Sequence, residues 1–204
     1  MMKALSLVRQ SLREYVLLNV LYYGLVAASM AYTYAFPQIQ KELLESLRAE
    51  FPEVFPSVVE AYIGGNFPLA AALTFLTNLV LGSFAYITLP SLILPFGGVA
   101  LGCIRAVAWG LVLAPTSPEL ALAMIPHSLT LILEGQGYIL AMFAVFLQWK
   151  GITWPSSIGE EKRSKAYLTG IKKTMSMYIL VALVLAVSAI YEAFEVIYIV
   201  RTLR

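Results

Sequence analysis

The hydrophobic positions of this chain gather into five long apolar runs, which short polar segments separate. The runs cover residues 16–36, 67–87, 92–113, 126–149 and 175–198. Each is about twenty residues long or longer, the length that an α-helix needs to cross the hydrocarbon core of a bilayer. The pattern predicts an all-α, polytopic transmembrane helix bundle of about five spans, which forms a single membrane domain over residues 1–204.

Residues 37–66, between the first two runs, are polar and acidic, and their apolar positions recur at intervals of three and four. This spacing predicts an amphipathic helical loop that is interrupted near Pro52 and Pro56. We expect the loop to lie outside the membrane as a cap over the bundle. A docking surface for an external protein partner and a helix lying in the membrane interface are the alternatives.

Basic residues gather in the N-terminal segment and in the loop over residues 150–173. They are Lys3, Arg9 and Arg13 in the first, and Lys162, Arg163, Lys165, Lys172 and Lys173 in the second. By the positive-inside rule both segments are expected to be cytoplasmic, in a multi-pass protein of the cell membrane. The first apolar run is about twenty residues long, whereas a cleaved signal has an apolar core of about 7 to 15 residues, so we expect a retained anchor rather than a cleaved signal.

Composition agrees with this class and excludes several functions. Hydrophobic residues make up 60% of the chain and charged residues 13%, and the net charge is only +2. These values predict an integral membrane protein, and they give no basis for nucleic-acid binding. With Cys103 as the only cysteine and His127 as the only histidine, we expect no disulfide framework, no metal site and no cofactor.

Several polar residues interrupt the apolar runs. An ionisable group at the centre of a spanning helix costs about 2.5 to 3.5 kcal/mol on insertion scales, so such groups usually face the protein interior or a wet cavity. His127 and Glu134 are seven residues apart and share one helix face, and Tyr138 lies one turn further on. We expect a polar cluster between helices, whose members are Asn78, Arg105, His127, Glu134, Tyr138 and Glu192.

Pairing within the cluster follows from charge. Arg105 needs an acidic partner, and we expect Glu134 first and Glu192 second. For His127 we expect a hydrogen bond to a neighbouring backbone group or to Glu134, and titration as a gate or proton relay is the alternative.

Two further patterns concern how the helices are built and packed. Gly98, Gly102, Ala106 and Gly110 follow one another at four-residue steps, a small-residue ridge that allows close helix packing, and we expect the protein to be a homo-oligomer through it. A short turn is expected near Pro90 and Pro95. Residues 118–125 are expected to form a short surface or re-entrant helix before the fourth span, rather than the start of one long tilted helix.

Five short motifs follow one another along the chain: FLTN over residues 75–78, LPFGGVALG over 94–102, IPH over 125–127, LEGQGYILA over 133–141 and IYEAF over 190–194. This ordered set resembles the stage II sporulation protein M family, an integral membrane protein family. The similarity covers roughly residues 67–200. Asn78, His127, Glu134 and Glu192 match the polar positions of the family. Two departures are the seven-residue spacing from His127 to Glu134, where the family usually has four, and Ser128 in place of glycine.

The resemblance implies a multi-pass, non-enzymatic protein, although a sporulation role carries over only to an organism that forms spores. We therefore expect a scaffold or accessory in membrane remodelling or transport, whose polar cluster holds the bundle together. The alternative is a small ion or solute channel or transporter in which His127, Glu134, Arg105 and Glu192 form a wet pathway. An enzyme is not expected, because Ser128 and His127 point about 100° apart on a helix.

Overall fold

The computed structural model of the chain describes residues 2–50, 56–158 and 162–200, and every regular element in them is a helix. No strand occurs in these residues, so the all-α fold is confirmed. The helices are, in order, α1 (Met2–Gln10), α2 (Leu12–Ala35), α3 (Gln38–Glu50), α4 (Pro56–Ile63), α5 (Phe67–Leu76), the π-helical η1 (Thr77–Thr88), α6 (Leu89–Ser91), α7 (Gly97–Leu113), α8 (Pro118–Thr153), the 3₁₀ turn η2 (Pro155–Ile158), α9 (Arg163–Phe194) and the π-helical η3 (Glu195–Ile199).

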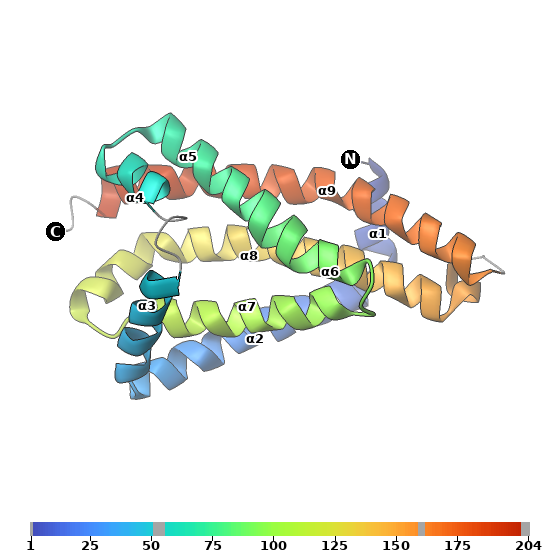
Figure 1. Ribbon diagram of the computed structural model, residues 1–204, viewed down its shortest axis with the longest axis horizontal. Coiled ribbons are helices and arrows are strands. Elements are labelled where there is room, and N and C mark those ends of the chain that lie inside the picture. The colour runs from blue at the N-terminus through green and yellow to red at the C-terminus, as the bar shows by residue number, and fades with distance from the viewer. Residues whose placement is uncertain (1, 51–55, 159–161, 201–204) are drawn as a thin grey trace.

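The main helical segments run back and forth along the long axis of the bundle (Figure 1). They are α2, the continuous stretch from α5 through η1 to α6, then α7, α8 and α9. Four of these are long and apolar enough to cross a membrane: Leu12–Ala35, Phe67–Ser91, Pro118–Thr153 and Arg163–Ile199. The fifth, α7, has 17 residues and rises about 25 Å, slightly less than a hydrocarbon core of about 30 Å.

Large apolar side chains cover much of the outer surface of these helices. Val20 is 66% exposed, Ile93 87% and Ile125 70%, and many other exposed residues on α2, α5 and α9 are equally apolar. Water does not favour an apolar surface of this extent, whereas lipid tails do. The length and the exposed surface of the helices both indicate a membrane protein.

Helix α8 is the central element. In its most apolar stretch 67% of the residues are buried, against 28% to 39% in the other three candidate spans. An almost unbroken run from Tyr138 to Val145 belongs to the main core cluster, where Ile139, Met142 and Phe143 are fully buried. The other helices therefore surround α8, and polar groups on α8 face protein rather than lipid.

Two predicted boundaries are wrong. Residues 118–125 do not form a separate surface or re-entrant element, because α8 is one helix of 36 residues with Pro126 inside it. A proline removes one backbone hydrogen bond and bends a helix without having to end it, and Figure 1 shows the first turns of α8 angled away from the rest. The basic loop expected over residues 150–173 is also mostly helical, because α8 ends at Thr153 and α9 begins at Arg163.

The short turn expected near Pro90 and Pro95 is present between α6 and α7. Phe96 has a φ of 54°, the left-handed conformation that reverses the chain direction. The Gly98 amide donates a hydrogen bond to Ser91 Oγ at 2.5 Å, and the Trp149 indole of α8 donates to the Ser91 carbonyl at 2.5 Å. The turn is therefore tied both to the start of α7 and to the central helix.

The small-residue ridge of α7 packs inside the chain. A Cβ atom on Gly98 would collide with the Ile87 carbonyl, one on Gly102 with Met142 of α8, and one on Gly110 with the backbone of α2 at Val26; Ala106 is fully buried. These small residues thus let neighbouring helices pack closely against α7, and those helices belong to the same chain. The ridge is thus covered within one chain, and a homo-oligomer, which stays a prediction, would need another surface.

Charge separates the two ends of the bundle. The end that holds α1, the last turns of α8 and the first turns of α9 carries Lys3, Arg9, Arg13, Lys150, Lys162, Arg163, Lys165, Lys172 and Lys173 (Figure 1). The opposite end carries α3, α4 and the start of α8, with the acidic residues Glu42, Glu45, Glu60 and Glu119. The loop over residues 37–66 is helical as expected, with α4 beginning at Pro56; the break expected at Pro52 lies outside the described residues.

Candidate functional site

A cavity of about 530 Å³ lies inside the bundle, between α4, α5, η1, α7, α8 and α9. Five of the six polar residues singled out in the sequence line it: Asn78, Arg105, His127, Glu134 and Glu192. The remaining wall is largely apolar and includes Val58, Ala108, Trp109, Val112, Leu113 and Leu131. The volume lies within the range of about 300 to 1,000 Å³ that is usual for small-molecule sites.

The sixth residue, Tyr138, closes one side of this site and connects three of the others. Its hydroxyl accepts a hydrogen bond from Arg105 Nη2 at 2.6 Å and lies 2.6 Å from Glu134 Oε1 and 3.0 Å from Asn78 Oδ1. Arg105 and Glu134 themselves are 3.7 Å apart, longer than a direct hydrogen bond. The Tyr138 hydroxyl therefore bridges the ion pair and links η1, α7 and α8.

Local sequence explains how Tyr138 reaches this position. It lies one turn after Glu134 on α8, so the two side chains share a face. Gly82 of η1 lies opposite, where a Cβ atom would come within 2.9 Å of the Tyr138 hydroxyl. The absence of a side chain at Gly82 thus leaves room for the hydroxyl against η1.

Two aromatic rings hold the Arg105 guanidinium. Its central carbon lies 4.0 Å from the centroid of the Tyr138 ring and 5.3 Å from that of Trp109, one turn further along α7. Cation–π contact of this kind stabilises a charge that is partly removed from water. The expected partner of Arg105 is confirmed, because its ion pair in the described residues is with Glu134 rather than with Glu192.

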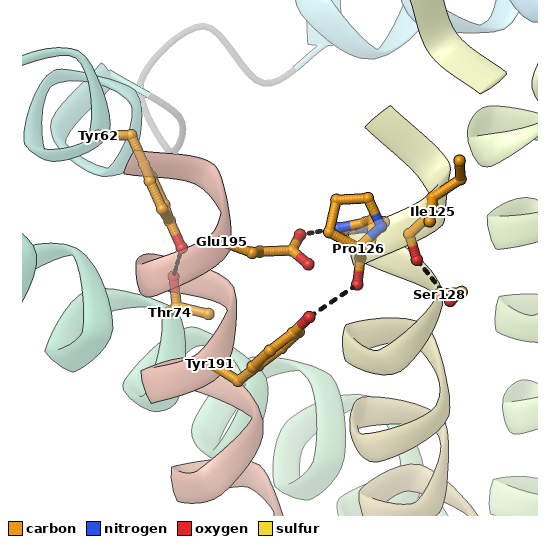
Figure 2. Close-up of polar contacts among 8 residues, drawn as sticks. Tyr62, Thr74, Ile125, Pro126, Ser128, Tyr191 and Glu195 are labelled. Atoms are coloured by element: carbon orange, nitrogen blue, oxygen red, sulfur yellow. Dashed lines mark hydrogen bonds and ion pairs between the residues drawn. The ribbon is translucent and has the colours of Figure 1, made fainter. Parts of the chain in front are cut away.

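His127 has a different partner from the one expected. Its Nδ1 lies 2.5 Å from Glu195 Oε1, and Glu195 is fully buried. The expected bond to a neighbouring backbone group or to Glu134 is therefore wrong. The reason is the packing of the end of α9 against the bend at Pro126, where the Tyr191 hydroxyl also donates to the Pro126 carbonyl at 3.1 Å. Figure 2 shows both contacts entering from the same side.

A second, smaller cavity of about 200 Å³ lies on the other side of His127. It is lined by Gln40, Leu120, Ala123, Met124, Glu195 and Val200, among others, and it shares Val112, Leu113 and His127 with the larger cavity. The His127–Glu195 pair thus stands at the boundary between a cavity near the acidic end of the bundle and the central cavity.

Glu192 enters the central cavity from α9 without joining the Tyr138 network. The Tyr62 hydroxyl of α4 interacts with the Glu192 carboxylate. The same hydroxyl lies 2.9 Å from Thr74 Oγ1 (Figure 2). The Oε2 atom of Glu192 is buried and has no hydrogen-bond partner in the described part of the chain. A buried, unpartnered carboxylate oxygen is costly, so this atom needs a proton or a ligand.

Sequence reasoning missed three polar residues that shape the site. Glu195 follows Glu192 by three residues and could have been found by that spacing. Gln40 of α3 donates from Nε2 to the carbonyls of Val112 at 2.6 Å and Ala114 at 3.0 Å, so it caps the end of α7. Gln136 accepts from the Tyr15 hydroxyl at 2.5 Å and so ties α2 to α8. For Gln40 and Gln136 no sequence signal was present, because single glutamines are common on helices.

In the described residues no group of three or more histidine, cysteine or acidic side chains is placed to hold a metal ion. Comparison with known proteins adds no assignment, since no family model, no curated protein and no solved structure matches the chain. The arrangement of the cavity is therefore the basis for any functional conclusion.

Proposed function

We propose that this chain is a non-enzymatic membrane transport protein, in which the central cavity receives a small solute on its way across the bilayer. One observation carries the proposal: five intramembrane polar side chains from η1, α7, α8 and α9 line a single cavity of about 530 Å³. Polar groups that serve only to hold helices together would be expected to meet in a dry contact.

The hydrogen bonding of the cavity supports this preference. Glu192 Oε2 and Arg105 Nε are buried and have no partner in the described residues. A cluster selected only for stability would satisfy such groups, because each unsatisfied one costs about 1 to 3 kcal/mol. Unsatisfied groups that face a cavity are typical of sites that bind water, ions or solutes.

The route that we infer enters from the acidic end of the bundle. It leads through the smaller cavity, passes the His127–Glu195 pair and reaches the central cavity, whose inner side is closed by Tyr138. Beyond Tyr138 the fully buried Met142 and Phe143 fill the interior. A packed interior beyond the cavity is the arrangement expected for one state of a carrier with alternating access.

The second candidate is the scaffold or accessory role in membrane remodelling that the resemblance to the stage II sporulation protein M family implies. The network around Tyr138 favours it, because that network links η1, α7 and α8 and would hold the bundle together. In this role the external face of α3 and α4 would receive a protein partner, and a homo-oligomer would have to use a surface other than the ridge of α7.

We further propose that the protein resides in the cell membrane with its N-terminus in the cytoplasm. The basic end of the bundle supports this orientation, because cytoplasmic segments carry an excess of lysine and arginine.

The test is flux of protons and small cations into proteoliposomes between about pH 5 and 8, a range that covers titration of a histidine. We expect flux by the native chain and its loss in Glu134→Gln, whereas Glu119→Gln, at an exposed position of the same helix, should leave it unchanged. Absence of flux from folded native protein, with lower stability in Glu134→Gln, would instead favour the scaffold role.

A further inference from the structure

Two hydrogen-bond acceptors of the central cavity, Asn78 Oδ1 and Glu192 Oε2, lack a full set of donors among the described residues. The Tyr138 hydroxyl carries one proton, yet it faces two acceptors, Glu134 Oε1 at 2.6 Å and Asn78 Oδ1 at 3.0 Å. One proton can serve only one of these acceptors at a time, so the Asn78 carbonyl oxygen is short of a donor whenever the proton points to Glu134. Glu192 Oε2 has no donor in the described part of the chain. Two acceptors in the same cavity, one on η1 and one on α9, can thus accept hydrogen bonds from a ligand.

The charges of the site point the same way. Arg105 pairs with Glu134, and His127 pairs with Glu195, which lies on the far side of the histidine. Glu192 remains, and no further lysine or arginine lines the cavity in the described part of the chain. When it is ionised, a carboxylate in such a place requires a positive partner. A ligand that brings one positive charge can therefore take the place of the proton that Glu192 otherwise needs.

Size and lining distinguish an organic cation from a metal ion. A cavity of about 530 Å³ is far larger than a metal ion needs, and Val58, Val112, Leu113 and Leu131 offer apolar surface rather than oxygen ligands. The Trp109 ring adds an aromatic wall. An apolar body with one charged nitrogen that carries N–H groups fits this combination.

We propose that the central cavity binds a small organic amine in its protonated form, with the ammonium group between Glu192 and the Asn78 carbonyl and the apolar part against Trp109 and the aliphatic wall. This inference rests on the proposed transport function only in making the amine the transported solute. Binding itself is independent of transport and can be measured separately.

The probe is 2-phenylethylamine, titrated calorimetrically into the full-length protein in detergent micelles, with empty micelles as the blank. Phenylacetate and 2-phenylethanol are the matched anionic and neutral compounds. We expect the amine to bind about tenfold or more tightly than either, because only the ammonium gives Glu192 both a charge and hydrogen-bond donors. Equal affinity for the amine and phenylacetate would overturn the proposal without the need for any variant.

Variants locate the ammonium group. Glu192→Gln is expected to weaken amine binding about tenfold or more and Asn78→Ala about threefold or more, whereas Glu119→Gln is expected to have no effect. Circular dichroism and gel filtration establish that each variant is folded. Full affinity in folded Glu192→Gln would refute the assignment. Amine binding in a protein that shows no flux would leave this inference standing and reject the proposed transport function instead.

Discussion

Replacement of Tyr138 by phenylalanine removes a single oxygen atom from the centre of the polar network. The ring, its burial and its contact with the Arg105 guanidinium can remain, since phenylalanine has nearly the same shape. What is lost is the bridge between Arg105 and Glu134, which are 3.7 Å apart and therefore not directly hydrogen-bonded. The change thus isolates the contribution of the hydroxyl.

The free energy of unfolding that Tyr138→Phe should lose lies between two limits. Hydrogen bonds to charged groups contribute about 1.5 to 3 kcal/mol, whereas polar contacts between membrane helices average about 0.6 kcal/mol. The contacts of Tyr138 are with charged groups, which places the cost above the lower average. The neighbouring cavity can supply water to Arg105 and Glu134, which keeps the cost below the upper limit. We expect about 1.5 kcal/mol, a change of roughly tenfold in the unfolding equilibrium.

The assay is reversible unfolding by dodecyl sulphate in mixed micelles, followed by far-ultraviolet circular dichroism. The control is Tyr34→Phe, the same chemical change at a position of α2 that is 67% exposed, where no loss is expected. A double-mutant cycle with Glu134→Gln should give a coupling energy of about 1 kcal/mol, since the two residues share the bond that is removed. A loss equal to that of Tyr34→Phe, or a coupling energy near zero, would show that the hydroxyl does not bridge the pair.

Two further predictions concern packing and orientation. Gly98→Ala should lower the midpoint of unfolding, because the new methyl group would collide with the Ile87 backbone carbonyl. The control is Gly24→Ala, whose methyl group would meet nothing within 4 Å and should be neutral or stabilising by up to about 1 kcal/mol. Orientation can be tested with single cysteines at the exposed positions of Lys162 and Glu60, in a chain without its native cysteine. A membrane-impermeant maleimide should label Glu60→Cys in intact cells and Lys162→Cys only after lysis. Labelling of Lys162→Cys in intact cells would reverse the proposed orientation.

The sequence contained enough to predict which polar residues meet. Asn78, Arg105, His127, Glu134 and Glu192 lie in apolar helices, where exposure to lipid is costly, and this cost alone places them in the interior. The seven-residue spacing of His127 and Glu134 put both on the face of α8 that lines the cavity. Membrane helices thus reveal their interior polar positions more clearly than the helices of soluble proteins do.

The pairings were harder to predict because they depend on the way the helices end. His127 pairs with Glu195 since α8 bends at Pro126 and α9 continues as the π-helical η3, which sequence patterns do not specify. The same bend at Pro126 explains why the sequence pattern predicts a separate element over residues 118–125. The ridge of α7 shows a different limit, because small residues predict close packing without indicating whether the neighbour belongs to the same chain or to another copy.

The bridge from Arg105 to α8 has a consequence for how the protein is made. Arg105 precedes Glu134 by 134 − 105 = 29 residues, so during synthesis it reaches the membrane before its partner does. Helix α7 is short, and the charge of Arg105 on it is not neutralised until α8 is inserted with Glu134 and Tyr138. We therefore expect the two helices to enter the bilayer as a hairpin rather than one by one, and we expect α7 to be unstable in the lipid when a nascent chain stops between them.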